Sequence, residues 1–200
     1  MNIFKLIFLI SLIPLNVIGK TCSYKNLSKN FNFKVIPIPQ KEDIIKLVVK
    51  IIRKENSENI QTLTLECQGF YFDSFDGCKN IKSYSTKIND KMPTGDENDS
   101  GNFIVADFNF DGLEDFAIKR DRGGNGGPLY AYFIQGKDKK FYKNSYLSDI
   151  VEFFPIEINS ANKTITTFLH ANAYQKNKRV FKYDQKTKKW KCIYNKLNNF

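Results

Sequence analysis

The sequence predicts an all-β fold, and three observations support this. Short runs rich in aromatic and β-branched residues recur along the chain, turn-forming residues separate them at regular spacing, and no long amphipathic helix pattern competes with them. A chain of 200 residues is long enough for one domain with one sizeable core. We therefore expect a single domain of short antiparallel strands over residues 20–200.

Residues 1–19 have the features of a secretory signal peptide. Lys5 precedes an apolar run, and Val17 and Gly19 form a cleavage site before Lys20. The apolar run is too short for a typical membrane span. We expect an exported protein, periplasmic or secreted, that has no membrane span. A lipoprotein anchored at Cys22 is the alternative, and Lys20 disfavours it.

The next segments lead into a predicted hairpin. Residues 20–43 are expected to be an irregular N-terminal segment that wraps the domain, with one edge strand before Pro37 and Pro39. Residues 44–53 and 60–67 are expected to pair as a hairpin, because turn formers connect them and the second run alternates apolar with polar residues. A helix is the alternative for the first run, but its β-branched content favours a strand.

The segment 107–115, with sequence DFNFDGLED, predicts a calcium loop between two strands. It places oxygen-bearing side chains at alternate positions around a turn that Gly112 permits, and Ca²⁺ takes six to eight oxygen ligands. An EF-hand is excluded because its twelfth position is Ile118 rather than glutamate. A metal-free turn of Asx residues is the alternative. The expected ligands of this stabilising site are Asp107, Asn109, Asp111, the Leu113 carbonyl and Asp115.

Further strands are expected downstream, and a glycine-rich loop lies among them. That loop, residues 120–127, lacks the Lys-Ser/Thr pair of a phosphate-binding loop. The expected strands lie within residues 129–134, 140–142, 164–169, 179–183 and 189–194.

The cysteines are even in number and all follow the cleavage point, in a compartment where disulfides persist. Four cysteines allow three pairings. We favour Cys67 with Cys78, which closes a short loop, and Cys22 with Cys192, which ties the two ends together. A structural zinc site is not expected because no C-x-x-C pair exists.

The chain is basic, with a formal net charge of +10 from 31 Lys and Arg against 21 Asp and Glu. Such a balance favours polyanions or an acidic protein surface. The lysines are dispersed, and we do not expect an exported protein to bind nucleic acid. No Ser-His-Asp or Cys-His motif appears, and His170 is the single histidine, so we do not expect an enzyme.

The calcium segment also carries a family resemblance. Residues 105–118 are similar to the calcium-binding turn of FG-GAP/VCBS-type repeats in β-propeller proteins. The order of this turn, the glycine-rich loop, the aromatic runs at 130–134 and 141–144, and the hairpin at 183–190 resembles a group of exported bacterial proteins. Some members of that group are periplasmic lysozyme inhibitors. The resemblance implies a β-propeller-like domain with an FG-GAP-type calcium loop.

The resemblance also implies a function. Inhibitors of this kind place a small-residue loop that ends in tyrosine into the cleft of the glycosidase, and this requires no catalysis. We therefore expect a monomer that binds and inhibits a lysozyme or other peptidoglycan hydrolase. An envelope or adhesion module that holds polyanions is the alternative. The segment that matches the inhibitory loop is His170, Ala171, Asn172, Ala173 and Tyr174.

This chain departs from the inhibitor pattern in two respects. It lacks a Ser-Gly pair before the tyrosine. Its charge also has the same sign as that of animal-type lysozymes, so electrostatic steering would not favour such a target.

Overall fold

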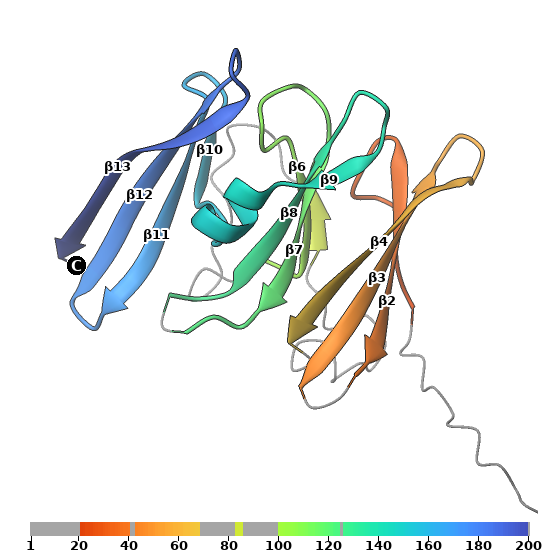
Figure 1. Cartoon of the computed structure of the whole chain (residues 1–200), viewed down its shortest axis with the longest axis horizontal. Coiled ribbons are helices and arrows are strands. Elements are labelled where there is room, and N and C mark those ends of the chain that lie inside the picture. The colour runs from red at the N-terminus through yellow and green to blue at the C-terminus, as the bar shows by residue number, and fades with distance from the viewer. Residues whose placement is uncertain (1–20, 41–42, 69–82, 86–99, 125, 200) are drawn as a thin grey trace, which may run out of the picture.

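The computed structural model describes residues 21–199 except 41–42, 69–82, 86–99 and 125. These residues form three β-sheets, and one short helix lies beside the middle sheet (Figure 1). The prediction of an all-β fold is confirmed. The expected signal peptide lies outside the described residues, and no described helix is long and apolar enough to cross a membrane.

The N-terminal sheet is antiparallel throughout. The predicted hairpin is confirmed as two paired strands, and the helix alternative is wrong. In spatial order the sheet contains β1 (Cys22–Tyr24), β2 (Phe31–Pro39), β3 (Ile44–Arg53) and β4 (Asn59–Gln68).

The expectation of a mostly irregular N-terminal segment is wrong, although the edge strand expected before the two prolines lies within β2. β2 pairs along its whole length with β3 and packs Phe31, Phe33 and Val35 into the core, where each is 1% exposed. The two prolines misled the sequence interpretation. Among the described residues, β1 pairs only with residues 33–35, so the rest of β2 has no described partner strand on that side, and prolines are tolerated at such an edge.

The middle sheet pairs β5 with β6 in parallel and its other strands antiparallel. A short helix, η3 (Leu147–Val151), follows it and was not predicted. The strands of the sheet are β5 (Ser83–Ser85), β6 (Phe103–Ala106), β7 (Asp115–Asp121), β8 (Leu129–Gln135) and β9 (Phe141–Lys143).

Side chains of the middle sheet alternate between two hydrophobic cores, as the two-residue period of a strand requires. Phe103 and Phe116 pack against the N-terminal sheet, with ring centroids 5.0 Å apart. Their neighbours Ile104 and Ala117 point the other way, into a core shared with η3 and the C-terminal sheet. The three sheets therefore stack as layers, with the middle sheet covered on both faces.

The C-terminal sheet is antiparallel, and its strands are longer than predicted. It contains β10 (Glu157–Asn159), β11 (Thr164–Asn172), β12 (Gln175–Asp184) and β13 (Lys189–Asn199). Phe181 and Trp190 anchor it to the second core. Beyond Phe181 the strands continue toward the β11–β12 turn without any fully buried residue on β12.

The predicted disulfide pairings are wrong, because Cys67 and Cys192 are free thiols. Cys67 is 4% exposed in the first core, and Cys192 is partly exposed on β13. Cys22 is disulfide-bonded, and Cys78 lies outside the described residues. Spacing along the chain misled the prediction, since it does not report which thiols the sheets bring together.

Candidate functional site

The predicted calcium loop joins β6 to β7. Its polar side chains accept hydrogen bonds from backbone N–H groups of the same loop. The Asp107 carboxylate accepts from the backbone N–H groups of Asp111, at 3.1 Å, and Gly112, at 2.8 Å. The side-chain Oδ1 of Asn109 also accepts from Asp111 N, at 3.2 Å. Gly112 has a φ of +84°, the left-handed conformation for which glycine was expected. The predicted residues are therefore brought into one tight turn.

Asp115, the residue expected to close the site, is fully buried. Its Oδ2 accepts from Phe108 N at 2.9 Å and its Oδ1 from Gln135 N at 2.8 Å. Burial raises the pKa of Asp115 well above its usual value, and the charges of Asp107 and Asp111 raise it further, while the two N–H donors lower it in part. The ionised form of Asp115 is therefore less favourable than that of an exposed aspartate, and a nearby cation would favour it.

Burial likewise raises the pKa of Asp107, and the charge of Asp111 adds to this effect, while N–H donors from the loop oppose it. The loop thus gathers carboxylates that repel one another.

The oxygen atoms of the loop are of the kind that binds Ca²⁺, but in this structure they also accept hydrogen bonds from the protein. Carboxylate and amide oxygens are the ligands that Ca²⁺ prefers, and each carboxylate oxygen that accepts one N–H keeps a second lone pair. However, the Asn109 amide nitrogen donates to Asp111 Oδ2, at 2.9 Å. Within the described residues no three His, Cys, Asp or Glu side chains are grouped to hold a metal ion. The calcium site stays a prediction.

The same loop links all three sheets. Glu114 accepts from Ser28 Oγ at 2.6 Å and from Lys29 N at 2.8 Å, which ties the loop to the connection between β1 and β2. Gln185, in the β12–β13 turn, donates to the Phe110 carbonyl at 2.9 Å. Sequence analysis missed these contacts because the partners are 86 and 75 residues apart and no local pattern marks them.

The predicted partner-binding segment is a hairpin rather than an open loop. Residues 170–172 belong to β11, where His170 pairs with Lys176, and only Ala173 and Tyr174 form the turn. Tyr174 N donates to the side-chain Oδ1 of Asn172 at 2.9 Å, a local bond typical of asparagine in turns. Tyr174 is 80% exposed. The structure thus presents one aromatic ring at the tip of a hydrogen-bonded hairpin.

The two candidate sites lie at opposite ends of the strands. Gln185 contacts the calcium loop from the far end of β12, whereas Tyr174 directly precedes the near end. A ten-residue strand is about 33 Å long. Figure 1 shows the β6–β7 loop at the upper edge and the β11–β12 turn at the lower left. A metal in the loop would therefore not be part of a site around Tyr174.

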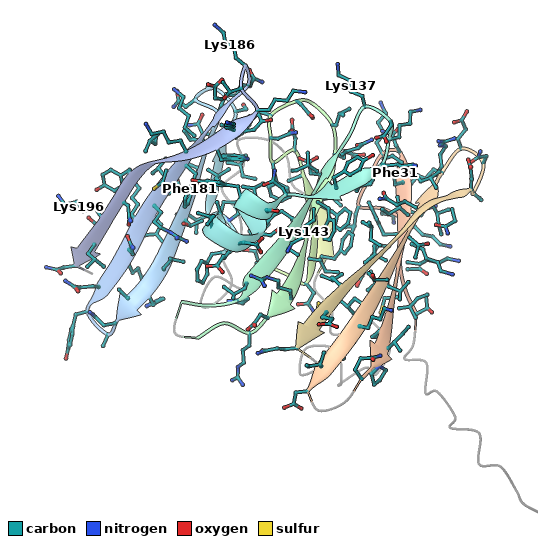
Figure 2. The ribbon with its side chains drawn as sticks, in the orientation of Figure 1. Phe31, Lys137, Lys143, Phe181, Lys186 and Lys196 are labelled. Carbon is teal, nitrogen blue, oxygen red and sulfur yellow. The ribbon has the colours of Figure 1, made fainter. Side chains whose placement is uncertain are left out.

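A groove of about 440 Å³ runs beside the calcium loop. Asn109 and Asp111 line one side, and Lys137, Lys143 and Lys188 lie along the rest. Figure 2 shows Lys137 extending from the β8–β9 turn at the same edge. The other described lining residues include the aromatic side chains of Tyr142 and Tyr183 and the apolar side chain of Ile134.

No protein-family model matches the sequence, and no curated protein matches it. The fold is similar to a solved structure described as "Structure of a Xanthomonas Type IV Secretion System related protein". The match has a TM-score of 0.58 and 15% sequence identity, and it covers 90% of this chain and 82% of that chain. At this identity the likeness establishes a shared fold and nothing about shared activity.

Proposed function

We propose that this protein is an exported inhibitor of a lysozyme or other peptidoglycan hydrolase, and that it acts by placing Tyr174 in the active-site cleft. The observation that supports this best is the exposure of Tyr174, 80%, at the tip of a hairpin that extends past the hydrophobic cores. The Tyr174 side chain belongs to neither hydrophobic core. A deep cleft in a partner would bury it.

The hairpin has the properties of a rigid plug. Its two strands pair from Thr164 with Lys182 to Asn172 with Gln175, so little backbone entropy remains to be lost on binding. Ala171 and Ala173 are small and exposed, which lets the backbone approach the walls of a cleft closely. The Tyr174 ring supplies buried area, and its hydroxyl suits the carboxylates of a glycosidase. The inhibition would be physical blockade without a chemical step.

The comparison with known structures is compatible with an envelope protein. The neighbour from Xanthomonas is described as related to a type IV secretion system. Together with the expected signal peptide, it supports a periplasmic or secreted location. The face-to-face stacking of three sheets supports the propeller-like description that the family resemblance implies.

We also propose that Ca²⁺ stabilises the β6–β7 loop, held by Asp107, Asn109, Asp111, the Leu113 carbonyl and Asp115. The mutual repulsion of the three carboxylates supports this, since a dication would offset it. When bound, the ion would supply structural stabilisation only. The hydrogen bonds of Asp115 to β8 and of Glu114 to the N-terminal connection would transmit that stabilisation to the sheets.

The test is inhibition of lysozymes and other peptidoglycan hydrolases of several classes by the mature protein and by Tyr174→Ala. Loss of a buried aromatic anchor should raise the inhibition constant roughly thirty-fold or more. Tyr142→Ala is the control, because Tyr142 is also an exposed tyrosine, at 54%, but lies on β9. Equal inhibition by wild type and Tyr174→Ala would refute the plug.

The alternative is an envelope or adhesion module without inhibitory activity. The net charge of +10 favours it, because a basic surface holds polyanions. Failure to inhibit any hydrolase class would move the assignment to this alternative.

A further inference from the structure

The outer face of the C-terminal sheet is strongly basic. Phe181, Tyr183 and Trp190 point into the second core, so the residues between and beyond them at alternate positions point outward. On β12 and β13 the outward positions hold six lysines, which we call the lysine face: Lys176, Lys178, Lys182, Lys189, Lys191 and Lys196. Figure 2 shows Lys196 pointing away from the outermost strand.

Stability of the fold does not explain the lysine face. Lys178 lies directly opposite Lys196, and Lys182 lies directly opposite Lys191. Like charges in opposed positions of an antiparallel pair destabilise the sheet. Among the ion pairs formed within the described residues, none involves these four lysines.

The outer face of the sheet also carries acidic and aromatic residues. By register, Glu157 and Asp184 are its acidic residues in the described part of the chain. Phe168 and Tyr194 lie among the lysines, and the Lys178 ammonium is 5.6 Å from the centroid of the Phe168 ring. A cationic surface with aromatic groups is suited to close contact with a negatively charged partner.

The size of the lysine face fits a macromolecule. From Lys176 to the end of β12 the strand rises about 27 Å, and four strands span about 14 Å. A small anion would cover a small part of this area. An average protein interface covers about 800 Å² on each partner, and the flat area of the face, about 380 Å², is roughly half of that before the hairpin tip is added.

We propose that the lysine face docks against an acidic rim around the active-site cleft of the hydrolase that Tyr174 enters, so the target is an acidic enzyme. This inference rests on the proposed inhibitory function. Lys176 and Lys178 follow Tyr174 on the same strand, and Lys196 is the cross-strand neighbour of Lys178. A cleft that admits Tyr174 must therefore lie close to these lysines. Steering between opposite charges would raise the association rate.

The charge of the whole chain agrees with this target. A basic animal-type lysozyme would repel the lysine face, whereas an acidic bacterial muramidase would attract it. A polyanionic polymer would also be attracted, but it offers no cleft for Tyr174. Tyr174 at the hairpin tip and the adjacent lysine face together favour a folded acidic enzyme as the partner over a polyanionic polymer.

The experiment measures association by surface plasmon resonance with purified muramidases of acidic isoelectric point, an animal-type lysozyme and soluble polyglutamate. The variant Lys178→Glu/Lys196→Glu reverses one opposed pair near the tip. Its control is Lys34→Glu/Lys50→Glu, because Lys34 and Lys50 form an opposed pair on the N-terminal sheet and the net charge changes equally. Circular dichroism melts confirm that both variants fold.

We expect the wild type to bind an acidic muramidase with a Kd at least tenfold lower than that for the animal-type lysozyme. At low ionic strength the tip variant should associate about tenfold or more slowly, and the control variant within about threefold of wild type. Added salt should reduce the difference between wild type and the tip variant.

Other outcomes separate the two claims. Equally slow association of both variants would overturn the docking face, because the net charge alone would then determine the association rate. Inhibition that Tyr174→Ala abolishes but the tip variant retains would also overturn it, and would leave the proposed function intact. Binding of polyglutamate without binding of any muramidase would overturn both claims.

Discussion

Asp115 connects the chemistry of the β6–β7 loop to the middle sheet. Both of its oxygens accept backbone N–H groups inside the protein, from Phe108 and from Gln135. Asp115→Ala should lower the free energy of unfolding by about 2 to 4 kcal/mol, because two buried donors would lose their acceptors. Urea denaturation measures the change.

The comparison for this prediction is Asp149→Ala. Asp149 forms a surface ion pair with Lys143 at 3.3 Å, and surface pairs contribute little. If Asp115→Ala were as stable as Asp149→Ala, the hydrogen bonds of Asp115 would not hold the loop.

The calcium proposal makes a separate prediction at Asp111. Calcium should raise the melting temperature of the wild type, because a ligand that binds only the folded state stabilises it. In Asp111→Ala the melting temperature should not respond to calcium. Differential scanning calorimetry measures the melting temperature. Magnesium at equal ionic strength is the control that separates calcium binding from the screening of charges by salt. An identical response in both proteins would exclude this loop as the site.

The two free thiols should differ in reactivity. Burial raises the pKa of the Cys67 thiol to about 12, and its side chain is hardly exposed, whereas Cys192 is partly accessible. Because the thiolate is the reactive species, iodoacetamide should label Cys192 in the native protein and Cys67 only after unfolding. Peptide mass spectrometry identifies the labelled cysteine. Equal native labelling would show that the first core opens.

At the scale of single residues, the sequence predicted what depends on local geometry. The turn at Gly112 and the convergence of Asp107, Asn109 and Asp111 follow from spacing, and the structure contains them. The tether from Glu114 to Ser28 and the thiol state of Cys67 depend on contacts between distant segments. No local pattern encodes such contacts.

Among the elements, β2 departs most from the sequence-based expectation. Phe33 packs against three aromatic neighbours of the middle sheet in tilted and edge-to-face arrangements, and its ring centroid lies 4.9 Å from that of Phe103. Phe33→Ala should therefore lower the free energy of unfolding by about 3 to 5 kcal/mol. Lys34→Ala, one position along and exposed, should change it little. Chemical denaturation of the two variants tests whether β2 is part of the core.

The strand predictions succeeded where apolar residues alternate and failed at the ends of strands. β4 shows the alternation clearly, whereas β3 was predicted from its β-branched content. The extensions of β11 and β12 toward Tyr174 consist of polar and small residues, so no hydrophobic period marks them. Cross-strand hydrogen bonds sustain these strands, and a hydrophobic pattern does not report those bonds.

At the scale of the whole molecule, the shared middle sheet should make unfolding cooperative. Both cores include side chains of this sheet, so loss of packing on one face removes support from the other. In Phe33→Ala, amide hydrogen exchange should accelerate in β11 and β12 as well as in the N-terminal sheet. Acceleration confined to β1–β4 would show that the sheets unfold independently.

In the proposed inhibitor, the exposed half of the β11–β12 hairpin would separate recognition from folding. Ala173 and Tyr174 contact neither core, so their replacement should leave the free energy of unfolding nearly unchanged. In the proposed inhibitor, mutations at this turn could therefore accumulate without first requiring compensating changes elsewhere. Specificity for a partner could then diversify at this position while the scaffold stays constant.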